Sequence, residues 1–241
     1  MTVTWEGLGW EQLAPGVGRC RLPVWDCTAG LVVGEGSALL IDAGSSLAEG
    51  ARLRAQAQEL AGRRVTLLAL THPHFDHVFG AAAFAGAEIF AAAGAEEVFV
   101  QDREGLRADA VRNGLGTGAA QEAADALARP RHQVRERWTL DLGGCREVLL
   151  VNVGPGHTAH DLAVVVPGEI PVVFCGDLVE ESGEPQAGPD AVPSRWPAAL
   201  DRLLGLGGED ALYVPGHGAV VDAEFVRAQR DALAARFGVS R

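Results

Sequence analysis

The sequence of 241 residues contains no lysine, so its permanent positive charges are all arginines. Acidic residues outnumber basic ones by 32 to 20, which gives a formal net charge of −12 at pH 7. A field of that sign repels polyanions, and contacts with phosphates dominate the affinity of proteins for nucleic acids. We therefore expect no nucleic-acid partner, unless arginines gather locally on the folded surface.

Long apolar segments and paired cysteines are also missing. The longest apolar run is far shorter than the roughly 20 residues of a membrane helix, so we expect no membrane partner. Residues 1–6 have neither a basic head nor an apolar segment, so we expect no secretory signal and a cytoplasmic location. The four cysteines, Cys20, Cys27, Cys145 and Cys175, have no paired spacing, which suits reduced thiols. Cys175 stands close to a candidate ligand, but we interpret it as a buried strand thiol.

Three histidines and an aspartate lie within residues 71–77, whose sequence is THPHFDH. The apolar run 65–70 directly before them predicts a buried strand, which places the cluster on a loop at the end of that strand. Imidazole and carboxylate groups are ligands that zinc and similar divalent metals prefer. Four such side chains at adjacent and alternating positions favour a metal site over an ordinary surface loop.

Three later motifs have the same placement, each just past an apolar run and beside glycine. They are Gly156-His157-Thr158, Gly176-Asp177 and Pro215-Gly216-His217-Gly218. The four motifs in this order resemble those of the metallo-β-lactamase-fold hydrolase superfamily. The resemblance runs from about Leu31 to Gly218, and all the metal positions of the superfamily are filled. It implies an α/β fold, a four-layer αβ/βα sandwich in which two mixed sheets pack face to face with helices outside.

Local patterns along the chain agree with this architecture. Two-residue apolar periods and glycine turns predict strands at 11–13, 18–22, 31–33, 37–41, 87–91, 139–142, 146–153, 162–166, 172–175 and 211–214. Helical periods predict helices at 46–60, 78–84, 196–204 and 222–237, with Gly62 and Gly205 as stops and Asp222 as an N-cap.

A hydrophobic content of 48% lets a chain of this length fold as one domain over residues 1–241. The charged, alanine-rich stretch at about 96–137 predicts a helical insertion in two or three pieces. Such an insertion suits either a substrate lid or a solvated helical excursion.

Carried over position by position, the resemblance implies a binuclear metal site. One metal would be held by His72, His74 and His157, the other by Asp76, His77 and His217, and Asp177 would bridge both. The implied cofactors are two zinc ions, with iron or manganese as alternatives. A pair of metals about 3.5–4 Å apart lowers the pKa of the water between them, so a bridging hydroxide would be the nucleophile.

One of these ligands would have a second role, and three further residues would act around them. Asp76 would orient the hydroxide as well as bind metal, which makes it the catalytic residue. Asp42, Thr71 and Thr158 would brace the ligands through hydrogen bonds, although Asp42 equally suits a cap of the following helix.

The superfamily does not name a substrate, but departures from its pattern narrow the choice. Residues 178–184 are acidic where glutathione-thioester hydrolases and zinc β-lactamases grip an anionic group with a basic residue. Asp177 stands where the common secreted β-lactamases have a cysteine, and we expect no C-terminal domain after His217. We therefore expect a hydrolase of a small, neutral or weakly charged ester, lactone or thioester.

Other functions stay open at this point. The same fold includes mononuclear iron persulfide dioxygenases, which use a set of the kind that His72, His157 and Asp177 provide. β-Lactam or phosphodiester hydrolysis and a non-catalytic binding role are further alternatives, and the oligomeric state, a homodimer included, is not fixed. The substrate-binding residues are unknown, with His160, Trp196, Trp25, Phe75 and Phe79 as weak candidates.

Overall fold

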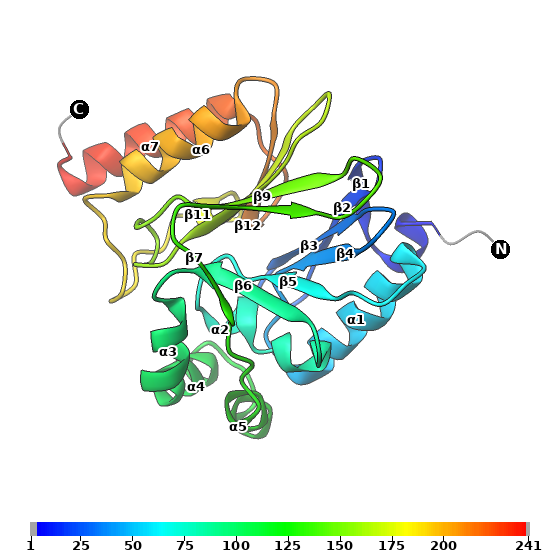
Figure 1. Cartoon of the computed structure of the whole chain (residues 1–241). Coiled ribbons are helices and arrows are strands. Elements are labelled where there is room, and N and C mark those ends of the chain that lie inside the picture. The colour runs from blue at the N-terminus through cyan, green and yellow to red at the C-terminus, as the bar shows by residue number, and fades with distance from the viewer. Residues whose placement is uncertain (1–3, 240–241) are drawn as a thin grey trace.

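The computed structural model describes residues 4–239. Residues 1–3, which belong to the stretch from which we expected no secretory signal, lie outside that range. Figure 1 shows two β-sheets packed face to face, with helices covering the outer face of each. The predicted four-layer αβ/βα sandwich with two mixed sheets is confirmed. Within residues 4–239, no helix combines the length and the apolar character needed to cross a bilayer.

The first sheet contains seven strands in chain order. They are β1 (Glu11–Ala14), β2 (Val17–Arg21), β3 (Thr28–Val33), β4 (Ala38–Ile41), β5 (Leu67–Ala69), β6 (Glu88–Ala92) and β7 (His132–Val134). The pairs from β1 to β4 are antiparallel, and those from β4 to β7 are parallel. The carboxyl ends of parallel strands lie at one edge, where α/β proteins place their sites. Residues 71–77 follow β5 and emerge at that edge.

The second sheet contains five strands in the order β12-β11-β10-β9-β8. They are β8 (Arg137–Asp141), β9 (Glu147–Asn152), β10 (Leu162–Val166), β11 (Val172–Glu180) and β12 (Leu212–His217). Strands β8 to β11 pair antiparallel, and β11 pairs parallel with β12. The second sheet is therefore mixed as well.

Apolar side chains fill the three interfaces between the four layers. Leu39 and Ile41 of the first sheet meet Leu150 and Phe174 of the second in the central core. Separate cores lie under the helices that cover the outer face of each sheet. The alternation of inward and outward side chains along each strand produces this arrangement, since successive side chains point to opposite faces.

The helices on the first sheet are α1 (Leu47–Ala61), α2 (Phe75–Val78), α3 (Ala95–Gln101), α4 (Arg103–Arg112) and α5 (Thr117–Asp125), with 3-10 turns at Glu6–Leu8 and Ala81–Phe84. Those on the second sheet are α6 (Trp196–Gly207) and α7 (Ala223–Phe237). Helix α1 ends at Gly62, which has φ 63°, and Asp222 accepts a hydrogen bond from the Phe225 N–H at the start of α7. Both predicted caps are confirmed.

Three local predictions were wrong. The helix expected to stop at Gly205 continues to Gly207, because Leu203 is fully buried and the packing of α6 outweighs the cost of about 1 kcal/mol for glycine in a helix. The helix expected at 78–84 starts earlier, at Phe75, and is followed by a 3-10 turn. The insertion is helical in three pieces only up to Asp125, since β7 pairs with β6 as a strand. Its role as a lid stays a prediction.

Candidate metal centre

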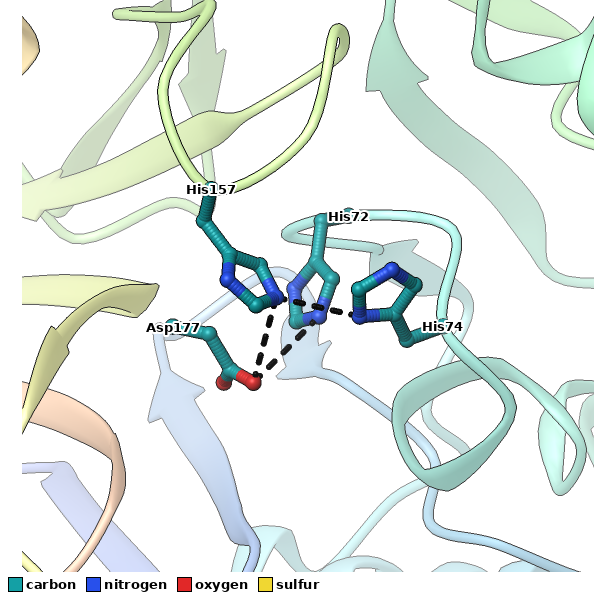
Figure 2. Close-up of side chains that lie close together, drawn as sticks. All are labelled: His72, His74, His157 and Asp177. Atoms are coloured by element: carbon teal, nitrogen blue, oxygen red, sulfur yellow. Dashed lines mark hydrogen bonds and ion pairs between the residues drawn. The ribbon is translucent and has the colours of Figure 1, made fainter. Parts of the chain in front are cut away.

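Seven candidate ligands from four separate segments converge at one edge of the sandwich. Four come from the turn after β5 and from α2, one from the loop after β9, one from β11 and one from the end of β12. They are His72, His74, Asp76, His77, His157, Asp177 and His217. Figure 2 shows four of them with their rings and carboxylate directed toward a common point.

The first cluster contains three histidines and one carboxylate. His157 Nε2 lies 3.0 Å from His74 Nδ1 and 3.5 Å from Asp177 Oδ2. His72 Nε2 lies 3.6 Å from the same oxygen. One ligand atom from each of the four residues falls within 4.8 Å of the others, which is the spacing of atoms that could share an ion.

The second cluster adjoins the first through Asp177. His77 Nε2 lies 3.2 Å from Asp177 Oδ1, and His217 Nε2 lies 3.3 Å from Asp177 Oδ2. Asp76 Oδ2 is 3.3 Å from His217 Nε2 and 3.6 Å from His77 Nε2. The carboxylate of Asp177 therefore stands between the two sets of candidate ligands.

Glycines let the strands bring Asp177 and His217 this close. Gly176 has φ 54°, and a side chain there would collide with Thr71. A Cβ at Gly216 would overlap Oδ1 of Asp177. The register of β11 against β12 shifts at Gly176, so both strands continue past the ligands instead of ending before them. The expectation that Asp177 and His217 follow strand ends was wrong in this detail, because two short predicted strands extend through the site.

Each histidine has a second ring nitrogen held by a partner outside the cluster. His72 Nδ1 is 3.0 Å from the Thr71 hydroxyl, His77 Nδ1 is 2.9 Å from Asp42, and His74 Nε2 is 3.0 Å from Asp190. His157 Nδ1 and His217 Nδ1 lie 3.1 Å and 2.6 Å from the carbonyl oxygens of Gln186 and Trp25. Such contacts fix the tautomer and the ring orientation of metal-binding histidines. The remaining nitrogen of every ring faces the cluster.

Asp42 connects the turn of residues 71–77 to the end of β4. Its carboxylate accepts hydrogen bonds from the Thr71 N–H at 2.8 Å and from the Thr71 hydroxyl at 2.7 Å. The same carboxylate meets His77, so a single buried aspartate braces two parts of the turn. Asp42 also adopts φ 57°, while the helix cap that was its alternative role is supplied by Ser46.

The other residues singled out in the sequence lie around the cluster or behind it. Thr158 contacts Asp161, to which it donates both its N–H and its hydroxyl. His160 Nδ1 lies 3.0 Å from the Ala93 carbonyl oxygen and is not among the clustered ligands. Trp196 is completely buried and supports His157 from behind, with ring centroids 5.4 Å apart, so its ring cannot form a substrate wall.

The three other aromatic candidates for substrate binding differ in exposure. Phe75 and Phe79 are buried in the core under α1, while Trp25 is partly exposed and packs edge-on against Phe75. Only Trp25 of these three therefore reaches the surface beside the site.

Electrostatics divides the histidines into two kinds. Burial lowers the pKa of His72 well below its usual value and that of His157 to about 4, so both rings are neutral. Burial alone would also lower the pKa of His217, but Asp177 and Asp76 raise it to about 12. Despite burial, His217 and His77 hold the pKa of Asp177 well below its usual value. Without metal, protons on histidines compensate the buried carboxylates.

The residues present fit a divalent metal. Nε2 of His72 and Oδ1 of Asp177 are buried and have no hydrogen-bond partner within residues 4–239. Leaving such atoms without a partner is costly, and a cation would satisfy both. The donor set of imidazoles and carboxylates is also the type that zinc and iron bind.

Three residues at the site were missed by the sequence analysis. Asp190 and Gln186 belong to the irregular stretch between β11 and α6 and contact His74 and His157. Cys27 is fully buried, and its Sγ lies 3.6 Å from His77 and 3.3 Å from the Asp76 carbonyl oxygen. The contact between His74 and Asp190 joins residues 116 positions apart, and Cys27 has no cysteine at a paired spacing. Neither therefore leaves a periodic signal in the sequence.

Comparisons with known proteins identify relatives of this chain by sequence and by fold. A profile of the metallo-β-lactamase superfamily matches residues 22–217. A hydroxyacylglutathione hydrolase from Cupriavidus metallidurans is 43% identical over 61 residues, which are 24% of this chain and 23% of that relative. The match thus spans about a quarter of the length of this curated relative.

Solved structures match over nearly the whole chain. A metallo-β-lactamase from Pontibacter korlensis aligns with a TM-score of 0.73 at 19% identity, covering 93% of this chain and 97% of the other. A metallo-β-lactamase from Pseudomonas aeruginosa in its mono-zinc form gives a TM-score of 0.71 at 20% identity over 96% of each chain. At these identities the likeness shows the fold alone.

The profile match covers far more than half of the sequence and ends at the last of the seven candidate ligands. Fold, ligand set and profile therefore agree, and the chain belongs to the metallo-β-lactamase superfamily.

Proposed function

We propose that the chain is a metal-dependent hydrolase with a binuclear zinc site that acts on a small ester, lactone or thioester. The observation that carries this proposal is the position of Asp177, whose two oxygens face the histidines of both clusters. The partial match to a hydroxyacylglutathione hydrolase, a thioester hydrolase, supports a thioester as the first substrate to try.

We assign the seven residues to two ions. His72, His74 and His157 would bind one metal, Asp76, His77 and His217 the other, and Asp177 both. When bound, the ions would supply Lewis acidity that lowers the pKa of a water and polarises the substrate oxygen.

The protein's own groups prepare the site for this chemistry. The buried Asp42 fixes His77 and the Thr71 turn, so the ligands need little rearrangement. Asp76 is 8% exposed, and its Oδ2 lies among the histidines of the second cluster, where it can accept a proton from a water and orient it. The fixed positions of these groups would lower the reorganisation needed in the transition state.

An iron persulfide dioxygenase is the alternative function. It would need only His72, His157 and Asp177. The complete second cluster of Asp76, His77 and His217 favours the binuclear hydrolase.

The test is a hydrolysis panel on zinc-loaded protein with thioesters, lactones, a β-lactam and bis-p-nitrophenyl phosphate. We expect turnover of a thioester or lactone, and we expect His74→Ala to abolish it without loss of fold. His132→Ala is the matched control, because His132 lies outside the clusters, where it stacks on Phe90. Retained turnover in His74→Ala would show that the site is placed wrongly.

A further inference from the structure

An arginine-rich groove lies at the edge of the second sheet. It has a volume of about 720 Å³ and is lined by Arg135, Arg137 and Arg202, together with Glu136, Asn152 and Gly154. Three arginines against a single glutamate give the lining an excess of positive charge in a chain whose formal net charge is −12. The groove is therefore a positively charged region on a molecule whose net charge is negative.

Two of the three arginines are available to a ligand. Arg135 and Arg137 are exposed, and neither side chain has a hydrogen bond or an ion pair with another residue in the range 4–239. Elsewhere on the surface many arginines are paired, as Arg107 is with Glu104 and Arg227 with Glu209. A guanidinium group presents a planar fork of donors that matches the oxygens of a carboxylate or a phosphate.

The groove is built on the chain segment that leads into the metal centre. Arg137 at the start of β8 is paired with Val151 near the end of β9, and the Asn152 N–H donates to the Glu136 carbonyl oxygen at 2.9 Å. The Arg202 guanidinium of α6 donates to the carbonyl oxygens of Val153 and, at 2.7 Å, Gly154.

His157 follows Gly154 by three residues, in the loop that continues from β9. The turn of residues 135 and 136 also joins β7 of the first sheet to β8 of the second, so it crosses from one sheet to the other. The groove and the metal ligand therefore share one short loop.

We propose that this groove binds the anionic end, a carboxylate or a phosphate, of a substrate whose reacting acyl bond lies at the metal centre. This inference rests on the proposed hydrolase function and makes its substrate class more specific. Residues 178–184 are acidic, which had suggested a neutral or weakly charged substrate; the structure supplies the missing cations from a different segment.

The test compares thioesters that differ only in a terminal carboxylate or its neutral carboxamide, with spacers of increasing length. In the double variant Arg135→Gln, Arg137→Gln we expect the ratio of kcat/KM for the carboxylate to that for the carboxamide to fall by about tenfold or more. Arg129→Gln, Arg131→Gln is the matched control. It removes the same charge from exposed residues of the same segment that do not line the groove, and should leave the ratio within about twofold. An equal ratio in all three proteins would overturn the proposal.

A second measurement separates this inference from the hydrolase assignment. Metal-free protein is titrated with inorganic phosphate and with glutarate and followed by NMR, which needs no turnover. The anion that binds wild type and control but not the Arg135→Gln, Arg137→Gln variant shows whether the groove takes a phosphate or a carboxylate. Absence of arginine-dependent binding of either anion would refute the groove even if the protein hydrolyses neutral esters. If no ester, lactone or thioester is hydrolysed, the assignment as a hydrolase fails, and the titration alone decides whether the groove binds anions.

Discussion

At the scale of single residues, we expect the candidate metal centre to exchange protons for metal ions. Two largely buried carboxylates, Asp76 and Asp177, face histidines at 3.2 to 3.6 Å. Burying such charges without partners is very costly, so the metal-free site must retain positive charge. The imidazoles supply it while protonated, and they must lose those protons before they can coordinate a cation.

We therefore predict that metal binding releases protons near neutral pH. The pKa of His217 is raised to about 12, and the Cys27 sulfur and nearby carboxylates raise that of His77 well above its usual value in spite of burial. Both rings are thus protonated in the metal-free protein at pH 7. Because these protons compete with the metal, the apparent affinity for zinc should rise as the pH rises through the neutral range.

Calorimetric titration with zinc in buffers of different ionisation enthalpy measures the number of protons released. The heat should depend on the buffer and indicate a net release. A heat that is the same in every buffer, together with an affinity that falls with rising pH, would refute this description.

Asp190 provides a second prediction at the residue scale. Its carboxylate lies 3.0 Å from His74 Nε2, although its side chain is 47% exposed. An asparagine in its place is a weaker, uncharged acceptor that can also turn its NH₂ group toward the ring, so the tautomer of His74 is less well fixed and its other nitrogen becomes a poorer donor to metal. We expect Asp190→Asn to weaken zinc binding by about 10- to 100-fold.

Competition with a chromophoric chelator measures this affinity. Asp109→Asn is the control, because Asp109 is paired with Arg112 on α4, outside the cluster. An unchanged affinity in Asp190→Asn would mean that Asp190 is only a surface neighbour of His74.

At the scale of secondary-structure elements, close backbone contacts hold the metal-binding turn in place. Gly80, just after α2, lies against Gly50 of α1 and against Ala43 after β4. A Cβ at Gly80 would overlap the carbonyl oxygen of Ala43, and backbone cannot move aside as a side chain does.

We predict that Gly80→Ala destabilises the protein by about 1–3 kcal/mol, as overpacked sites do. Gly118→Ala provides the comparison, since Gly118 lies in α5 with open space around its Cβ position and should be neutral or slightly stabilised. Urea unfolding of the two variants measures the difference. Equal stabilities would show that the contact at Gly80 relaxes without cost.

The features that could be predicted from the sequence are those with a local signal. The motif of residues 71–77, Asp177 and His217 were visible because ligand-type residues followed apolar runs. The two predicted caps, Gly62 at the end of α1 and Asp222 at the start of α7, follow local rules that need no tertiary information.

Features that depend on tertiary packing were not visible. Helix α6 passes through Gly205 because its buried face continues to the core, and β7 forms because β6 offers an open edge beside it. The partners of the ligating histidines, Asp190 and the carbonyl oxygen of Gln186, come from an irregular loop. No period or spacing in the sequence connects that loop to His74 or His157.

At the scale of the whole molecule, the site joins the two halves of the sandwich. His72, His74, Asp76 and His77 follow a strand of the first sheet, whereas Asp177 and His217 belong to strands of the second. Ions held by both sets would link the sheets. Anything that binds only the folded state stabilises it, by about 2.7 kcal/mol for a ligand at 100 times its dissociation constant. As metal ligands, the seven residues would serve stability and chemistry together.

The most direct test of the central claim is the metal content of the purified protein, measured by inductively coupled plasma mass spectrometry after saturation with zinc and removal of the excess. We predict two zinc ions per chain in the wild type and fewer in His217→Ala, which removes a ligand of the second cluster. A single iron per chain after purification, or no metal retained by the wild type, would contradict the binuclear site.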